Sequence, residues 1–334
     1  MTTMWMVRSD SGKRYDDFHD RAAAGIGFRE IAESAKPGVS RKALVQTYQA
    51  ACPEAGERST MAAVSQVYRF VNEIHENDVV VTYSPANRTY LVGTVTGPSE
   101  HKSEWSDQGM GLSRPVKWLP NEVDRDKLST SARNSLGSSL TVFKLSDEVR
   151  DEILAITAGG STPLPPPVVP EENVEPDPLA DYESIAFERI KDQVNRLGWE
   201  GMQQLIAGIL RAMGYKTQVS PPGSDLGRDI LASPDGFGFE RPRIVVEVKH
   251  RKQTMGSTDI RSFLGGRHPD DRGLYVSTGG FTKDARYEAD RSTVPLALWT
   301  LDEVTKALLD NYESTDTKTR SLISLRTFYG PVAD

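Results

Sequence analysis

Two charged residues in the C-terminal half have the types and spacing for phosphodiester chemistry. The segment RIVVEVKHRK, residues 243–252, has the pattern of a buried strand interrupted by Glu247 and Lys249. Side chains alternate along a strand, so Glu247 and Lys249 share one face with Val245. An isolated Glu-x-Lys pair is most often a solvent-facing salt bridge. Here the apolar flanks indicate a covered face, where charge needs a partner network or a purpose.

A third charged residue begins the preceding predicted strand. Asp229 opens DILAS, and a turn at residues 234–236 would fold that strand back onto residues 245–249. We therefore expect Asp229 and Glu247 to converge as oxygen ligands of one Mg²⁺, with Mn²⁺ as a possible substitute. Lys249 would orient the attacking water or stabilise the transition state. Gly223 and Gly227 would let a phosphate approach the backbone.

Basic residues follow this strand directly. His250, Arg251 and Lys252 form a cluster, and Arg261 lies a few residues further on. The chain as a whole has 40 Lys and Arg against 47 Asp and Glu, a net charge of -7, which argues against a generally basic nucleic-acid surface. DNA binding would therefore rely on local clusters such as this one. Ordinary solvated surface positions are the alternative interpretation for each of these residues.

The clearest boundary in the chain is a proline-rich stretch. Residues 158–178 contain seven prolines, four acidic residues and no basic or aromatic residue. Such a segment cannot bury a core, and its prolines favour an extended, semi-rigid geometry. It predicts a linker between domains at residues 1–157 and 179–334.

Hydrophobic spacing predicts the fold class of each domain. After the linker, two helices at residues 181–197 and 198–215 precede strands that alternate with helices, which indicates an α/β sandwich around a mixed central sheet. Residues 1–157 combine helical stretches with a β-hairpin at 77–97 and further short strands, a sheet-rich α+β pattern. A final helix there opens on Ser146 as its N-cap.

The C-terminal domain resembles Mrr-type restriction endonucleases of the PD-(D/E)xK nuclease superfamily. Six segments follow one another in the order seen in that family, over about residues 195–312: LRAMGY, GSDLGRDILA, VVEVKHRK, DIRSFLGG, GLYVSTGGFTKDARYEA and PLALWTLDEVTKAL. The resemblance implies Mg²⁺-dependent hydrolysis of DNA, with Asp229, Glu247 and Lys249 at the catalytic positions. Glu200 matches an acidic helix position that often faces the site, although a solvated helix surface is an equal alternative.

The N-terminal domain is similar, more loosely, to PUA-like domains of the EVE type over about residues 4–120. The segments that carry this likeness are MWMVR, AGIGF, VYRFVNEIHENDVVVTYSPANRTYLVGTVTG and RPVKWL. The likeness implies a small barrel with an aromatic pocket for a flipped, modified base. Trp5, Trp105 and Trp118 are the candidate pocket residues. Core positions are favoured for Trp5 and Trp118, and a ligand contact for Trp105, which lies in a polar loop.

Together these features indicate a DNA endonuclease of a restriction or defence system that cuts double-stranded DNA carrying modified cytosine, as type IV-like enzymes do. The alternatives are a repair or structure-specific nuclease, and a silent nucleic-acid-binding module. A homo-oligomer would supply the two active sites that a double-strand cut needs.

Composition excludes several other classes of protein. Cys52 is the only cysteine, so an internal disulfide and a cysteine-built zinc site are excluded. No apolar run approaches the roughly 20 residues that span a bilayer. The first residues lack the apolar core of a signal peptide, which predicts a cytoplasmic protein with no membrane partner.

Overall fold

The structure is a computed structural model that describes residues 2–159, 178–221 and 228–328 of the 334-residue chain. It divides into two compact units, one up to Ile185 and the other from Ala186. Most of the predicted linker, residues 160–177, lies outside the described residues. Helix α7, Pro178–Asn195, begins three residues earlier than expected, at the proline that ends the predicted linker, because proline is tolerated in the first turn of a helix.

A sheet forms the centre of the N-terminal unit. In the described residues its strands run in the order β2-β6-β4-β3-β1-β8, with β5 paired to β6 and β7 paired to β4. Only the β1–β3 pair is parallel among these pairings, and β3 and β4 form the predicted hairpin. The strands are β1 (Met4–Val7), β2 (Ala23–Ile26), β3 (Val79–Ser84), β4 (Thr89–Val95), β5 (Glu100–His101), β6 (Leu112–Trp118), β7 (Val123–Asp124) and β8 (Val142–Lys144).

Both faces of this sheet are covered. Along β1, Trp5 and Val7 belong to one hydrophobic cluster, and Met4 and Met6 belong to another. The helices are α1 (Tyr15–Asp20), α2 (Arg29–Ala32), α3 (Arg41–Ala51), α4 (Glu57–Tyr68), α5 (Thr130–Ser135) and α6 (Asp147–Thr157), and α4 continues as a π-helix over Arg69–Glu73. Ser146 caps α6 as predicted, since its hydroxyl accepts a hydrogen bond from the Val149 N–H.

The predicted PUA-like barrel is not established by this arrangement. A closed barrel needs its two end strands to pair, but β2 pairs only with β6 and β8 only with β1 within the described residues. The likeness to PUA-like domains stays a prediction.

The C-terminal unit is built on a mixed sheet, as predicted. In the described residues the strand order is β13-β12-β11-β10-β9. The β9–β10 and β10–β11 pairs are antiparallel, whereas β11, β12 and β13 run parallel. The strands are β9 (Lys216–Val219), β10 (Ile230–Ser233), β11 (Arg243–Lys249), β12 (Asp271–Ser277) and β13 (Leu296–Trp299).

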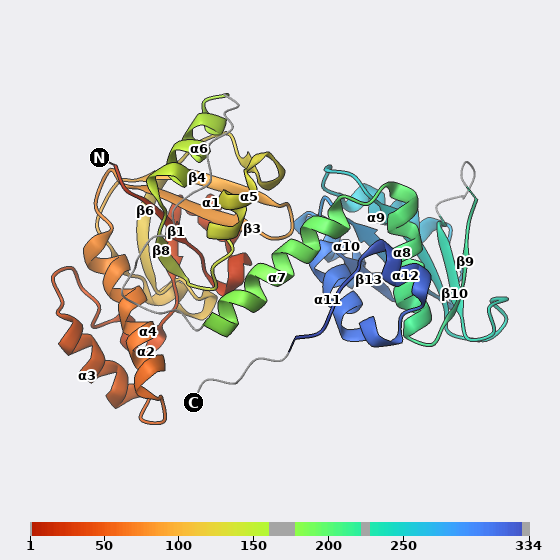
Figure 1. Ribbon diagram of the computed structural model, residues 1–334, viewed down its shortest axis with the longest axis horizontal. Helices are drawn as coiled ribbons and strands as arrows, with labels where there is room; N and C mark the ends of the chain where they lie inside the picture. The colour runs from red at the N-terminus through yellow and green to blue at the C-terminus, as the bar shows by residue number, and fades with distance from the viewer. Residues whose placement is uncertain (1, 160–177, 222–227, 329–334) are drawn as a thin grey trace. The chain divides into compact units, whose positions relative to one another are not determined.

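Helices pack on the two faces of this sheet, which confirms the predicted α/β sandwich (Figure 1). On one face Val246 and Leu274 contact the cluster of α8 (Trp199–Ala212) and α11 (Leu301–Asn311). On the other face Tyr275 packs with α9 (Ser257–Gly265) and α10 (Lys283–Asp290). The described residues contain no helix long and apolar enough to cross a membrane.

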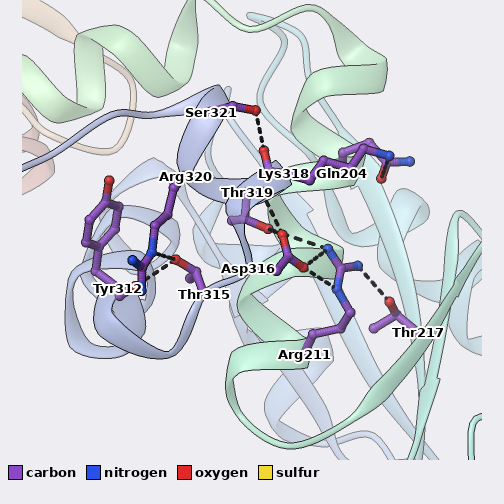
Figure 2. Close-up of polar contacts among 10 residues, drawn as sticks. All are labelled: Gln204, Arg211, Thr217, Tyr312, Thr315, Asp316, Lys318, Thr319, Arg320 and Ser321. Atoms are coloured by element: carbon purple, nitrogen blue, oxygen red, sulfur yellow. Dashed lines mark hydrogen bonds and ion pairs between the residues drawn. The ribbon is translucent and has the colours of Figure 1, made fainter.

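The last described helix, α12 (Thr317–Leu322), closes over the C-terminal end of α8 (Figure 2). Asp316 caps α12 by accepting the Thr319 N–H at 2.7 Å, and it also pairs with Arg211 of α8 at 2.7 Å. A Cβ atom on Gly208 would lie 2.0 Å from the Thr319 hydroxyl, so only glycine permits this close approach of the two helices. Helix α12 is therefore fitted to α8.

Candidate active site

The two predicted carboxylates lie just before β10 and within β11 of the same hairpin. Ile230 pairs with Val246 and Leu231 with Val245, and Asp229 directly precedes Ile230. The Asp229 N–H donates to the Val246 carbonyl at 2.9 Å, and its carboxylate accepts a hydrogen bond from the Val248 N–H, so Asp229 contacts both chain neighbours of Glu247. The hairpin thus brings Asp229 next to the segment that carries Glu247 and Lys249.

Both carboxylates are buried and bonded. Asp229 and Glu247 are 6% and 8% exposed. Asp229 accepts hydrogen bonds from the Val248 N–H at 2.6 Å and from the Gln203 amide at 2.7 Å. Asp229 is held in position by both β11 and helix α8.

Gln203 was not predicted as a site residue. It lies on the inward face of α8 with Met202 and Ile206 and is buried. Glu200, the helix residue named by resemblance, is one turn earlier and exposed. The spacing of Met202, Leu205 and Ile206 fixes which side of the helix is buried, and that signal separates Gln203 from its neighbour Gln204.

Lys249 lies beside the buried Glu247 and is itself partly exposed to solvent. Its ammonium lies 2.5 Å from a Glu247 carboxylate oxygen, and its side chain is 34% exposed. The two residues share one face of β11, as expected for positions two apart on a strand. A cation in this position can meet a phosphate arriving from solvent while it remains next to the carboxylates.

Aromatic residues line the same face of the sheet. Tyr275 of β12 pairs with Glu247 in register, and its ring packs edge-on against Phe263 and Phe281. Burial raises the pKa of the Tyr275 phenol, and the charge of Glu247 raises it further. An apolar wall of this kind lowers the local dielectric and strengthens electrostatic interactions at the site.

His250 has a structural position that the sequence did not indicate. One ring nitrogen lies 2.6 Å from the Leu197 carbonyl, before α8, and the other lies 3.2 Å from the Thr278 hydroxyl, after β12. Both nitrogens are therefore engaged within the protein, and its predicted contact with DNA would require one to be released. Nearby, a Cβ atom on Gly279 would lie 2.4 Å from the Gln253 carbonyl, so glycine lets the basic segment lie against this end of β12.

The other predicted DNA-contacting residues are exposed. Arg251 and Lys252 follow β11, and Arg261 lies on α9. The Arg251 guanidinium is 3.8 Å from Asp259, and that of Arg261 is 3.6 Å from Glu288. Exposed ion pairs of this length are weak and can be exchanged for phosphate contacts.

The donor set suits a hard cation. No group of three or more His, Cys, Asp or Glu side chains in residues 2–159, 178–221 and 228–328 is placed to hold a metal ion. Mg²⁺ is commonly held by one or two carboxylates together with waters and substrate phosphates. Asp229 and Glu247 fit that pattern. Gly223 and Gly227, expected beside a bound phosphate, lie outside the described residues, as does Asp225, an acidic residue of the same turn that could bind the metal through water.

The three tryptophans predicted for a base pocket differ in position. Trp5 is buried and its indole N–H donates to Asp78 at 3.2 Å, and Trp118 donates to the Phe18 carbonyl at 2.8 Å. Trp5 belongs to the core and Trp118 packs against it, the alternative that was favoured for both. Trp105 is half-buried in a 3-10 helix, Ser103–Gln108, with the Arg21 guanidinium 4.7 Å from its ring centroid.

Comparison with known proteins separates the two halves of the chain. Residues 194–308 match a family model described as a restriction endonuclease, of the Mrr catalytic type. Over these residues the chain is similar to restriction endonuclease catalytic domains. Residues 4–146 match a model described as a domain of unknown function, DUF8426, which does not test the resemblance to PUA-like domains.

Individual relatives are more distant. An uncharacterized protein, y4cE of Sinorhizobium fredii, is 28% identical over 98 residues, which are 28% of this chain and 25% of that protein. The match therefore spans about a quarter of that relative's length.

Two solved structures share a weak likeness with this chain. The MspJI restriction endonuclease in complex with a 27-mer oligonucleotide is 13% identical, covering 86% of this chain and 70% of that one, with a TM-score of 0.32. The DNA modification-dependent restriction endonuclease AspBHI is 15% identical, covering 80% and 74%, with a TM-score of 0.31. At these TM-scores neither structure supports a conclusion about this chain.

Proposed function

We propose that the chain is a Mg²⁺-dependent DNA endonuclease of a restriction system that acts on modified DNA. The observation that carries this proposal is the pair of buried carboxylates on one hairpin, Asp229 and Glu247, with Lys249 next to Glu247, inside the region that matches restriction endonucleases. The Glu247–Lys249 ion pair alone could be structural. The second buried carboxylate, that of Asp229, accepts from the Val248 N–H between these two residues, and two carboxylates are what a Mg²⁺ site commonly uses.

The chain's own groups suit phosphodiester hydrolysis. Asp229 and Glu247 would hold Mg²⁺, which supplies charge neutralisation of the phosphate and a more acidic water when bound. The Lys249 ammonium is placed to stabilise negative charge that develops on the phosphate oxygens or to orient the attacking water. In the reaction water adds to phosphorus and gives up a proton to solvent, one P–O ester bond breaks, and the leaving oxygen takes a proton from solvent. Gln203 holds the Asp229 carboxylate in position.

The direct test is digestion of matched plasmids, unmodified and carrying 5-methylcytosine or 5-hydroxymethylcytosine, with and without Mg²⁺ and with Mn²⁺ as a substitute. We expect cutting that needs the metal and is faster on modified DNA. Equal cutting of all plasmids would favour the repair or structure-specific nuclease, and binding without cutting would favour the silent module.

Recognition of the modified base is assigned to the N-terminal unit, with Trp105 as the stacking residue. It is half-buried in the 3-10 helix and, like Trp118, packs against the core, whereas the indole N–H groups of Trp5 and Trp118 are hydrogen-bonded within the fold. Stacking on an aromatic side chain contributes roughly 1–3 kcal/mol per base. Trp105→Ala should therefore weaken binding to modified duplexes about tenfold or more, and binding to plain DNA less.

Lys252→Ala is the matched control for that measurement. A phosphate contact carries no base information, so this substitution should weaken all duplexes alike and flatten the salt dependence of binding. If Trp105→Ala lowers the affinity for modified and plain DNA equally, the N-terminal unit does not read the modification. A protein-interaction or nucleotide-sensing role would then be favoured, while the nuclease assignment would be unaffected. We also propose that the protein forms a homo-oligomer, which would supply the two active sites that a double-strand cut needs.

A further inference from the structure

Trp199, the first residue of α8, is a large aromatic residue without a role in the core. It is 49% exposed, whereas Trp299, the other tryptophan of the C-terminal unit, packs against the hydrophobic cluster. A single exposed aromatic side chain is common on protein surfaces and carries no meaning by itself. Its position relative to the proposed catalytic residues decides whether Trp199 has a functional role.

The helix phase places Trp199 on the inward-facing side of α8. Met202 and Gln203, three and four residues later, are both buried, and residues at these spacings lie on one helix face. Side chains of a helix also tilt toward its N-terminus. Trp199 therefore lies on the same helix face as Met202 and Gln203. Unlike them it is about half exposed, because it is at the start of the helix.

Two contacts tie this end of α8 to the catalytic hairpin. The Leu197 carbonyl, two residues before Trp199, is 2.6 Å from His250, which directly follows Lys249. Gln203, one turn after Trp199, donates to Asp229 at 2.7 Å. Four residues of helix rise about 6 Å. Trp199 thus lies between the two points where the helix contacts the active-site strands, at the rim of the site.

We infer that Trp199 contacts the DNA substrate and stacks on a base next to the phosphate that is cut. This inference rests on the proposed nuclease function and adds a residue to it. Indole rings stack on any base, so the contact is tolerant of sequence. The base must expose one face, which is easiest where its neighbour is missing or mismatched.

The test compares the parent with Trp199→Ala, Trp199→Phe and the control Phe239→Ala. Phe239 is more exposed than Trp199 but lies in the β10–β11 turn, at the opposite end of the hairpin from Asp229. Each protein is tested on a duplex that contains the mapped cut site and on duplexes with a single abasic position beside it. Cleavage gives kcat and KM, and the affinity for the same duplexes is measured without divalent metal.

We expect Trp199→Ala to lower kcat/KM and affinity by about 5- to 140-fold, equivalent to about 1–3 kcal/mol at 1.4 kcal/mol per tenfold. Trp199→Phe should recover most of the loss, and Phe239→Ala should stay within about twofold of the parent. An abasic site at the contacted position should lower the affinity and kcat/KM of the parent. It should leave those of Trp199→Ala almost unchanged, because that variant has no indole ring to stack on the base.

The inference is overturned if Trp199→Ala behaves like the parent, or if every abasic position affects the two proteins equally. A parent that cuts no DNA with Mg²⁺ or Mn²⁺ would contradict the proposed nuclease function instead. In that case the metal-free affinities, measured with the abasic position moved along the duplex, still decide whether Trp199 stacks on a base. Thermal unfolding checks that the variants are folded.

Discussion

Both units of this protein bury charged side chains, but in different surroundings. In the N-terminal unit Arg114 is 3% exposed and donates to three backbone carbonyls, those of Phe70, Gly97 and Val71, at 2.8–3.2 Å. Burial lowers the pKa of its guanidinium to about 10, so it is still charged at neutral pH. In the C-terminal unit the buried carboxylates Asp229 and Glu247 lie on one hairpin, with the Lys249 ammonium 2.5 Å from Glu247. Arg114 is hydrogen-bonded within the fold and has the charge of Asp78 nearby, whereas the two carboxylates lie beside a cation that is 34% exposed.

The difference shows that burial of charge does not by itself identify a functional site. A buried ion whose hydrogen bonds are all made within the fold can have a purely structural role. Several ionisable groups gathered together are typical of sites that bind a cation or tune reactivity. Substitution of Arg114 should therefore change the free energy of unfolding, and substitution of Asp229 or Glu247 should change the rate of DNA cleavage.

The largest expected effect comes from Asp229→Asn. The amide oxygen can still accept the Val248 N–H, and Gln203 can turn its amide to present its oxygen. We expect cleavage to fall by about 10³-fold or more, because a neutral amide is a poor Mg²⁺ ligand, with unfolding changed by less than about 1 kcal/mol. Single-turnover cleavage and urea unfolding measure the two quantities. An Asn variant that cuts as fast as the parent would remove Asp229 from the site.

Asp229→Ala should behave differently from Asn. The sequence alone suggests that removing a site carboxylate relieves repulsion and stabilises the protein slightly. The hydrogen bonds from Val248 and Gln203 change that expectation, because alanine leaves two buried donors unpaired at about 1–3 kcal/mol each. Cleavage should be lost with both substitutions, whereas only Ala should lower the urea midpoint.

Arg114→Met is the corresponding test in the N-terminal unit. Methionine leaves the carbonyls of Phe70, Val71 and Gly97 without this donor, so we expect a loss of about 3–5 kcal/mol in the unfolding of that unit. The control is Arg41→Met, whose guanidinium is exposed and paired with Glu73 at 3.1 Å and which should cost under about 1 kcal/mol. Equal losses for the two variants would contradict the structural role of Arg114.

Gln203→Ala should have a smaller effect, on catalysis. Loss of the hydrogen bond to Asp229 should lower kcat about tenfold and raise the Mg²⁺ concentration needed for half-maximal rate. Gln204→Ala is the matched control, since Gln204 is the next residue and instead accepts from Lys318 at 3.2 Å. The positioning role fails if both variants show the same Mg²⁺ dependence.

The smallest effect concerns Asp316 and pH. Hydrogen bonds from the Thr319 N–H and hydroxyl, with the Arg211 guanidinium, lower the pKa of Asp316 to about 2, below the ordinary value of about 3.9. A depressed folded-state pKa adds stability above about pH 4, and this is lost as the pH falls toward 2. Asp316 is partly exposed, so the contribution is under about 1 kcal/mol. Asp316→Asn keeps the cap, and its stability should approach that of the parent between pH 4 and 2.

Much of the C-terminal unit was predictable because local patterns agree there with tertiary contacts. Alternation along residues 243–249 and the turn before it predicted the hairpin, which brings Asp229 into contact with Val246 and Val248 on either side of Glu247. Gln203 was missed because two adjacent glutamines look alike until the helix phase is fixed by its apolar residues. Glu200, named by resemblance, is exposed, and its place at the site stays a prediction.

The N-terminal unit was less predictable. Strands β2 and β8 have four and three residues, too short for a periodic signal, yet they form the two ends of the strand order. The choice between core and pocket for a tryptophan depends on distant residues such as Asp78, which accepts the Trp5 N–H from 73 residues away. No local pattern contains that information.

The fit of α12 to α8 has a practical consequence for anyone who expresses the catalytic region alone. The match to restriction endonucleases ends at residue 308, but Asp316 and Thr319, which contact Arg211 and Gly208 of α8, lie beyond it. Ile323, buried in the same cluster as α8, also lies beyond that limit. A fragment that stops at the limit would uncover the helix that holds Gln203 against Asp229. The shortest soluble, active fragment should therefore extend at least to Ile323.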